Sequence, residues 1–592
     1  MVDAPRPSTR ARAAPPGGGF IGEPNPLLVR ELRQSLRLAR LPWTITAAVA
    51  LIGLGMLSIG SLESTKGRSA QLGVTLYQAF VSILVLYVAL VGPATAAGSI
   101  ALEREGKTLE PLMLTSLSAK DIARGKFLAA YATLVVQVVA IFPLAAIPLL
   151  FGGVTAVELL VCAVYVMAIA AVSVAFGLSV ASRTQTLRGA LAVSILLPAG
   201  AAPFGFGLVT VLGEVLARRR WPFLTGGPIW WSTAYTSVPF GLDYAVWLLA
   251  WPLIALVLPY WLFRAVTAAN LAGPNDDHAS GIKRWFVGAS LLLSGAIFVT
   301  PFRVDIGSAP FASLLGQALV ATLLSVMILI LCGEPLAPSR LVRARWERNR
   351  AGALTRFLGP GLMRGAALHV LLAVVMLGAF YAGGLLASSP VGLREKIGVA
   401  SAGLPRAGIG GAHAIVVAYT LMFDVFLLGL AALLRTRGGS GDKVAVARAW
   451  TIVAAIVAAC VPWIVATISG TLVADERSAV LFAAPSPLFA IYAFNRELQA
   501  GVDPFRITAS ALGAAFVWGA IGLVLLGIAW ERARKIVVQG DRVAKVTDKK
   551  LDAEDEEGVD DDEDEPPAAL PPPPPLPGAS GPKPGDPEDP AP

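Results

Sequence analysis

EREGKTLEPLMLTSLSAKDIARGK, residues 103–126, is a charged segment that lies between two long apolar runs of the chain. Its first part predicts a short helix with one apolar face, formed at spacings of three and four by Leu109, Leu112, Met113 and Leu117. Its second part predicts a helix that opens at Ser118, whose hydroxyl can cap the backbone amide of Asp121. A soluble-looking helical insert in an otherwise apolar chain indicates a surface on which a partner docks.

The composition indicates a membrane protein. Of the 592 residues, 55% are hydrophobic and 15% charged, with a mean hydropathy of +0.67, and no ordinary water-soluble domain of this length has such values. Runs of about 20 apolar residues can cross a bilayer core of roughly 30 Å as helices. Such runs lie near 42–62, 74–100, 127–151, 154–181, 188–213, 240–266, 285–301, 311–332, 366–388, 412–434, 448–470 and 508–530. The prediction is an all-α polytopic integral membrane protein with about twelve transmembrane helices, as six plus six.

Lysine and arginine indicate which side of the membrane each loop faces. Cytoplasmic loops carry an excess of these residues, and most of the 48 in this chain fall in cytoplasmic segments when both termini are placed inside. The triplet 218–220 opposes this arrangement, because the same topology places its loop outside. We therefore expect a multi-pass protein of the plasma (bacterial inner) membrane with cytoplasmic N- and C-termini. The basic residues do not line one face with aromatics between them, so nucleic acid is not an expected partner.

The segments outside the apolar runs differ in kind. Residues 1–24 are rich in Pro, Gly and Arg and predict a disordered cytoplasmic tail. Residues 267–284 predict a cytoplasmic linker, and residues 531–550 a basic juxtamembrane segment. Residues 551–592 combine an acidic block with a proline run and predict a disordered tail. Two interpretations of that tail stay open, namely a solvated segment without a specific role and a segment that binds a basic partner.

Residues 25–41, which begin NPLLVRELRQSLRLAR, predict an amphipathic elbow helix at the membrane interface. An apolar stripe is formed by Leu28, Leu32, Leu36 and Ala39. Largely off that stripe, and expected to face lipid phosphates, are Arg30, Arg33, Arg37 and Arg40. The alternative is a plain basic helix next to the membrane.

The elbow and the insert together resemble the permease of type-2 ATP-binding cassette (ABC) transporters. The matching elbow residues are Asn25, Pro26, Arg30, Glu31 and Leu32. The matching insert residues are Glu103, Glu105, Thr108, Leu109, Glu110, Thr115, Leu117, Ser118, Gly125 and Lys126. The family commonly has Gly before Thr-Leu-Glu and Pro before Leu-Ser, and this chain has Lys107 and Ser116 there.

The resemblance implies that the insert is a coupling helix for a separate cytoplasmic ATPase. The ATPase-coupling residues would be Glu103, Glu105, Thr108, Leu109, Glu110, Leu112, Met113, Leu117, Ser118 and Asp121. The partner, as a dimer, would bind ATP-Mg, and this chain would bind no cofactor directly. The direction of transport would be export, and the substrate is not determined.

The resemblance also implies an external re-entrant element before the sixth span of each unit. Residues 227–243 and 484–503 both place Pro and aromatics before a Gly-x-Asp, which indicates a weak internal repeat. We therefore expect two fused six-span units, 42–266 and 285–530. The second insert, 333–365, is Arg-rich where the first is acidic and apolar, so its role in coupling stays open.

Motifs for catalysis are not found in the sequence. No G-x-x-x-x-G-K-[ST] phosphate loop occurs, so we expect a transport permease that is not itself an enzyme and that uses an ATPase in trans. His278, His369 and His413 are far apart in the sequence, without metal-binding or catalytic spacing.

One acidic residue, Asp424, falls near the middle of the tenth span. An ionised carboxylate there is costly and should face the bundle interior or a wet cavity. It is either a residue of the translocation path or a structural Asp that bonds with Thr420, one turn earlier. Secondary transporters usually carry several such groups. An ion-coupled secondary transporter is therefore the second hypothesis, and a non-transporting membrane assembly or scaffold protein is the third.

Overall fold

The computed structural model describes residues 26–560, apart from residues 38–39, 65–68, 110, 112–117, 213–220, 222, 225–228, 274, 300–308, 388–408, 438–442, 474–479 and 499–503. The predicted tail at 1–24, the acidic and Pro-rich residues from 561 and the arginine triplet at 218–220 lie outside these residues. The described residues form helices and no strands. Residues up to Ala533 form one compact unit and those from Arg534 another.

The first half begins with the elbow and contains six spans. Its helices are α1 (Pro26–Arg37), α2 (Arg40–Ser64), α3 (Ser69–Glu105), α5 (Ala119–Ile141), η1 (Phe142–Ala145), α6 (Ala146–Phe151), α7 (Ala156–Ala181), α8 (Leu187–Leu212), α10 (Trp230–Ser237), α11 (Leu242–Tyr244), η3 (Ala245–Ala250) and α12 (Trp251–Leu271). The third span is formed by α5, η1 and α6, and the sixth by α11, η3 and α12.

The second half also contains six spans. Its helices are α13 (Ser280–Val299), α14 (Ala309–Leu331), α15 (Arg340–Arg348), α16 (Ala353–Phe357), α17 (Leu362–Ala387), α19 (Ile409–Thr436), α20 (Lys443–Val473), η6 (Val480–Ala483), α22 (Phe489–Leu498) and α23 (Pro504–Asp560). In the described part of the chain, 12 helices are long and apolar enough to cross a membrane, and each overlaps one expected run. The predicted all-α architecture with about twelve spans is confirmed.

Two helix ends differ from the expected segment limits. The linker is shorter than 267–284, because α12 continues to Leu271 and α13 begins at Ser280, where the Asp277 carboxylate accepts the Ala279 and Ser280 N–H groups. The charged residues at the start of α13 hide this end from a search for apolar runs. The last helix, α23, continues to Asp560, beyond the expected start of the tail, because no proline interrupts the sequence between Pro504 and Pro566.

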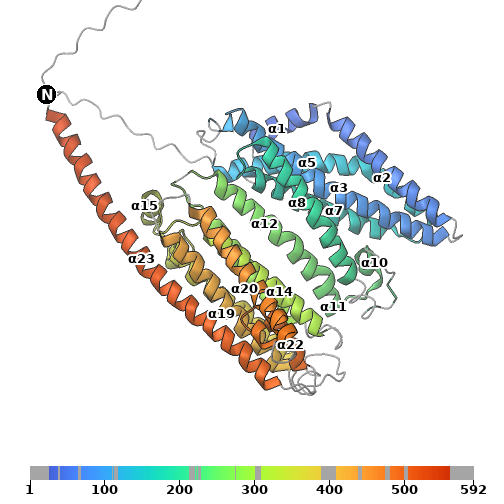
Figure 1. The fold of residues 1–592 in the computed structure, drawn as a ribbon. Helices are drawn as coiled ribbons and strands as arrows, with labels where there is room; N and C mark the ends of the chain where they lie inside the picture. The colour runs from blue at the N-terminus through green and yellow to red at the C-terminus, as the bar shows by residue number, and fades with distance from the viewer. Residues whose placement is uncertain are drawn as a thin grey trace, which may run out of the picture. The chain divides into compact units, whose positions relative to one another are not determined.

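In the first half, α3 is the central helix. It packs against α2, α5, α7 and α8, and Figure 1 shows these helices side by side. The backbones of α3 and α7 approach each other closely, because a Cβ added at Gly177 would lie 2.3 Å from the Pro93 carbonyl oxygen. Small residues let helix backbones approach in this way in membranes. The core includes Phe80, Leu84, Val88 and Val174, all of them fully buried.

In the second half, α17 and α19 are the central helices. The first of them packs against α13, α14 and α19, and α19 also packs against α14, α20 and α22. The two halves meet where α12 packs against α13, and there the Trp285 indole N–H donates to the Leu258 carbonyl oxygen at 2.8 Å. The core of this half includes Phe286, Phe380 and Phe489.

A short helix precedes the sixth span in both halves. In the first half this helix is α10, which packs against the fourth span α7, and in the second it is α22, which packs against the fourth span α19. The Tyr235 and Tyr165 hydroxyls are hydrogen-bonded between α10 and α7. The Tyr419 hydroxyl of α19 donates to the Ala484 carbonyl, just ahead of α22, at 2.8 Å. The two elements therefore have equivalent neighbours, as an internal repeat requires.

Candidate functional site

The base of the first insert is built around a buried lysine. Lys126, near the start of α5, has its Nζ 2.8 Å from Glu103 Oε2 and 3.2 Å from Glu31 Oε1. The same amine donates a hydrogen bond to the Ser99 carbonyl oxygen at 3.1 Å. A buried ammonium is tolerated only when opposite charges and acceptors surround it. These contacts join the elbow helix α1 and the C-terminal end of α3 to α5.

The two residues after Glu103 join α3 to the turn between α7 and α8. The Arg104 guanidinium donates to three carbonyl oxygens there, those of Ala181 at 3.2 Å, Ser182 at 3.1 Å and Thr184. Carbonyls at a helix C-terminus lack intrahelical partners, so a cation is favourable at this place. The Glu105 carboxylate accepts the Leu187 N–H at 2.7 Å, at the N-terminus of α8, where a negative charge is favourable.

The predicted ATPase-coupling residues fall into three groups. One group contacts the rest of the protein or is buried in it, namely Glu103, Glu105 and Leu109. A second group is exposed and comprises Thr108, Ser118 and Asp121. A third group lies outside the described residues and comprises Glu110, Leu112, Met113 and Leu117. The predicted cap at Ser118 is present, because its hydroxyl oxygen accepts the Asp121 N–H as the N-cap of α5.

The elbow helix contacts the protein through a residue outside its predicted apolar stripe. Leu27 is buried and packs in one cluster with Ile122, Ala123 and Leu271, which come from α5 and α12. Of the four predicted lipid-facing arginines, two are exposed on α1, namely Arg30 and Arg33. The side chains of the other two lie outside the described set, with Arg37 at the end of α1 and Arg40 at the start of α2.

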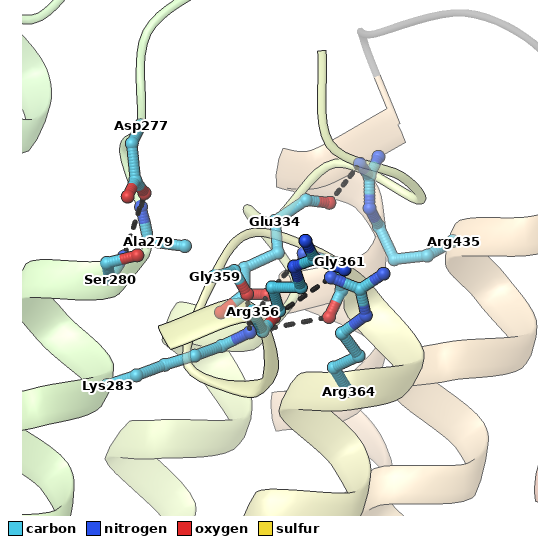
Figure 2. Close-up of polar contacts among 10 residues, drawn as sticks. All are labelled: Asp277, Ala279, Ser280, Lys283, Glu334, Arg356, Gly359, Gly361, Arg364 and Arg435. Carbon is cyan, nitrogen blue, oxygen red and sulfur yellow. Dashed lines mark hydrogen bonds and ion pairs between the residues drawn. The ribbon is translucent and has the colours of Figure 1, made fainter. Parts of the chain in front are cut away.

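The base of the second insert also contains a buried lysine. Lys283, in the first turn of α13, has its Nζ 2.8 Å from Glu334 Oε2 and donates to the Gly359 carbonyl oxygen at 2.9 Å. The Gly361 N–H donates to the same Glu334 oxygen at 3.3 Å, and Figure 2 shows these groups pointing toward one another. Gly361 has a φ of +148°, a backbone conformation that favours glycine. Burial raises the pKa of Glu334 to about 7, although the neighbouring Lys283 ammonium lowers it.

The remainder of the second insert carries exposed positive charge. Its helix α15 starts at the N-cap Ser339, whose hydroxyl donates to the Asn275 carbonyl oxygen at 2.6 Å. An exposed ion pair joins Arg345 to Asp276 at 3.3 Å. The exposed arginines of the insert are Arg340, Arg345, Arg348, Arg350 and Arg356. The fold therefore presents a basic surface here.

Asp424 is paired with a histidine and not with Thr420. One of its carboxylate oxygens lies 2.8 Å from His369 Nε2, and both side chains are buried in the second bundle. The Thr420 hydroxyl instead accepts a hydrogen bond from the Gln317 amide. His369, separated from Asp424 by 55 residues, therefore has a buried partner that the spacing of the histidines in the sequence did not predict. His413 lies between the rings of Phe380 and Phe494.

Sequence reasoning missed the residues that hold the two inserts in place. Lys126 was noted only as part of a family motif, and Arg104 and Lys283 were not singled out. A weak signal was available, because Lys126 and Lys283 each stand at the edge of an apolar run, where a lysine must either reach the interface or find a carboxylate. The partner of each lysine depends on helix packing and could not be read from spacing.

A comparison with known protein families matches the part of the chain that contains the elbow and the first insert. Residues 26–211 match the model of a family described as ABC-2 family transporter protein. The matched region contains the elbow helix, the first insert and the first five spans, as far as residue 211 of α8. No curated protein matches the chain. With twelve candidate spans among the described residues, the chain is an integral membrane protein whose residues 26–211 are similar to the ABC-2 family transporter proteins.

Proposed function

We propose that this chain is the membrane-spanning permease of an ATP-driven exporter, coupled to a separate cytoplasmic ABC ATPase through the insert at 103–126. The family match over residues 26–211 supports a permease. The observation that carries the coupling is the set of contacts at the base of this insert. Through Lys126, Arg104 and Glu105 the insert is joined to α1, α5, α7 and α8. A displacement of the insert would therefore be passed to several spans at once.

The coupling residues have two different roles in this function. Glu103 and Glu105 act as positioning residues, because their carboxylates contact Lys126 and the Leu187 N–H. The exposed Thr108 and the neighbouring part of the insert form the surface that meets the ATPase. Hydrolysis of ATP-Mg takes place on the partner, which acts as a dimer. The exposed Arg30 and Arg33 of α1 contact lipid phosphates.

Co-purification from the native membrane tests this proposal. The tagged full chain is isolated in mild detergent, and an accompanying ABC ATPase is identified by mass spectrometry. Glu110→Arg, on the insert, should lower the recovered ATPase by roughly tenfold or more, because reversing one charge at an interface costs upwards of about 1.4 kcal/mol. Glu531→Arg is the matched control, since it makes the same change at an exposed position of α23. Equal recovery in both variants, or no ATPase with the parent chain, would contradict the coupling.

A second candidate function is favoured by the pair of Asp424 and His369. A buried ionisable pair inside a bundle is typical of ion-coupled transport and of substrate paths, so a secondary transporter remains the alternative. Vesicles that contain the purified chain separate the two functions once a substrate is found. Transport on a proton or sodium gradient without an ATPase supports the alternative, and transport that needs the ATPase and ATP supports the permease, with Asp424 on its translocation path.

A further inference from the structure

A carboxylate at the end of the second span is paired with a buried lysine in both halves. In the first half, Glu103 lies in the last turn of α3, and in the second half Glu334 lies just after α14. Each carboxylate is 2.8 Å from its lysine Nζ, and both lysine side chains are 0% exposed. Equivalent places in the two halves therefore have the same charge chemistry.

The two lysines come from helices that are not equivalent. Lys126 belongs to the third span of its half, and Lys283 to the first span of the other. The third spans contain Arg124-Gly125-Lys126 and Arg364-Gly365-Ala366, so Ala366 stands where the first half has its lysine. Ala366 is buried, and a Cβ added at Gly365 would lie 3.2 Å from Glu334 Oε2. The start of α17 thus lies against the Glu334 carboxylate.

Helix packing explains how the first span reaches this carboxylate. In the first half, α5 packs more extensively against the elbow α1, which contributes Glu31, than against the first span α2, which packs chiefly against α3. In the second half, α13 itself packs beside α17. The first turn of α13 therefore occupies the place of the elbow and carries Lys283 where the elbow carries Glu31.

An arginine also joins the second and fourth spans in both halves, but it comes from a different span in each half. In the first half, Arg104 at the end of the second span donates to the Ala181 and Ser182 carbonyl oxygens at the end of the fourth. In the second half, Arg435 at the end of the fourth span donates to the Glu334 carbonyl oxygen, after the second span, at 3.2 Å. The contact between these spans is retained, although its donor has changed sides.

We propose that the second half has the same buried lysine–carboxylate pair as the first, with its lysine on the first span instead of the third. Lys283 is then the positioning residue of the second insert, and Ala366 is the position that corresponds to Lys126. The pair joins α13 to the loop at residues 359–361 and so holds the Arg-rich insert at the end of the bundle.

Placing a lysine on the third span tests the proposal. The purified full chain and its variants are compared by Tm in detergent at pH 8. Lys283→Met should lower Tm, because it leaves the Glu334 carboxylate without a countercharge. Ala366→Lys should lower Tm in the parent chain, where it adds a second buried cation, and should raise Tm in the Lys283→Met background. Ala366→Lys should thus change Tm in opposite directions in the two backgrounds. A lysine that is merely unfavourable at position 366 would lower Tm in both, so the opposite signs are specific to a lysine that replaces Lys283 as the partner of Glu334.

Ala367→Lys is the matched control, because Ala367 is the exposed neighbour of Ala366 on the same helix. It should not raise Tm in the Lys283→Met background. No gain from Ala366→Lys, or a gain equalled by Ala367→Lys, overturns the proposal, and so does an unchanged Tm for Lys283→Met. If Lys283→Met does not accumulate in the membrane, accumulation itself becomes the measurement. Recovery with Ala366→Lys then supports the equivalence of the two lysine positions, and failure to recover overturns it.

Limited trypsin digestion gives a local measurement at the insert. Lys283→Met should speed cleavage at the insert arginines by roughly tenfold, since loss of a buried pair favours local opening. Ala366→Lys in that background should return the rate toward the parental value, whereas Ala367→Lys should not. Unchanged cleavage in Lys283→Met would show that the pair does not position the insert.

Discussion

At the scale of single residues, buried charges are the main feature at the bases of the two inserts. Lys126 is fully buried between Glu31 and Glu103, and Lys283 is fully buried against Glu334. Removing one member of a buried pair leaves an uncompensated charge, which costs more than the pair contributes to stability. The free energy of unfolding should therefore be sensitive to these lysines and insensitive to their exposed neighbours.

Lys126→Met is expected to lower the free energy of unfolding by about 3–5 kcal/mol, because two carboxylates then share a buried site without a cation. The measurement is the Tm and the detergent-resistant yield of the purified chain. Lys120→Met is the control, since Lys120 lies exposed near the start of the same helix. A similar Tm for the two variants would show that Glu31 and Glu103 are satisfied in another way.

The pKa of Glu334 predicts a pH dependence of stability. Burial raises this pKa from 4.5 to about 7, so the folded protein holds the proton more tightly than the unfolded chain. The stabilisation is fully present below pH 4.5 and is lost as the pH rises through about 7, by roughly 3 kcal/mol at about 1.4 kcal/mol per pH unit. Glu334→Gln has no such proton. The stability of the parent chain relative to Glu334→Gln should therefore fall between pH 4.5 and 7, and a difference independent of pH would contradict the raised pKa.

At the scale of helices, close backbone approach determines which spans are neighbours. Gly177 of α7 lies against the backbone of Pro93 in α3, whereas a Cβ added at Gly98, also in α3, meets no atom within 4 Å. The same substitution should therefore have different effects at the two glycines.

Gly177→Ala should lower stability by about 1–3 kcal/mol, because its methyl group would force α3 and α7 apart. Gly98→Ala should be neutral or stabilising by up to about 1 kcal/mol, since alanine favours helix more than glycine. Thermal unfolding of both variants in one detergent checks the pair. Equal effects would mean that α3 and α7 do not meet at Gly177.

At the scale of the whole molecule, the two halves have related arrangements without identical contacts. The short helices α10 and α22 each precede a sixth span and pack against a fourth. The position of the first span differs, because α2 packs chiefly against α3 and α13 against α17. Two fused units of six spans require both short helices on one side of the membrane and both inserts on the other.

Cysteine labelling checks this topology. In a chain without its three native cysteines, single cysteines replace Ser237 of α10, Asn495 of α22 and Ala344 of α15, all exposed. An impermeant thiol reagent on cells, with any outer envelope opened, should label the first two positions and not the third. Protection at Ser237 would mean that the first half has a different number of spans.

The sequence by itself determined the class of protein, the number and order of the spans and the places of the two inserts. These features depend on local composition, since about 20 apolar residues can cross a bilayer and a charged insert cannot. The Ser118 cap was also predictable, because it joins residues three apart.

Only the tertiary structure decided which charges meet. Lys126 and Glu31 are separated by 95 residues, and His369 and Asp424 by 55. Apolar periodicity defines a helix and its buried face, but it does not specify which helix lies beside it. The same buried carboxylate is therefore paired with a lysine from α5 in one half and from α13 in the other, because different helices pack beside the third span.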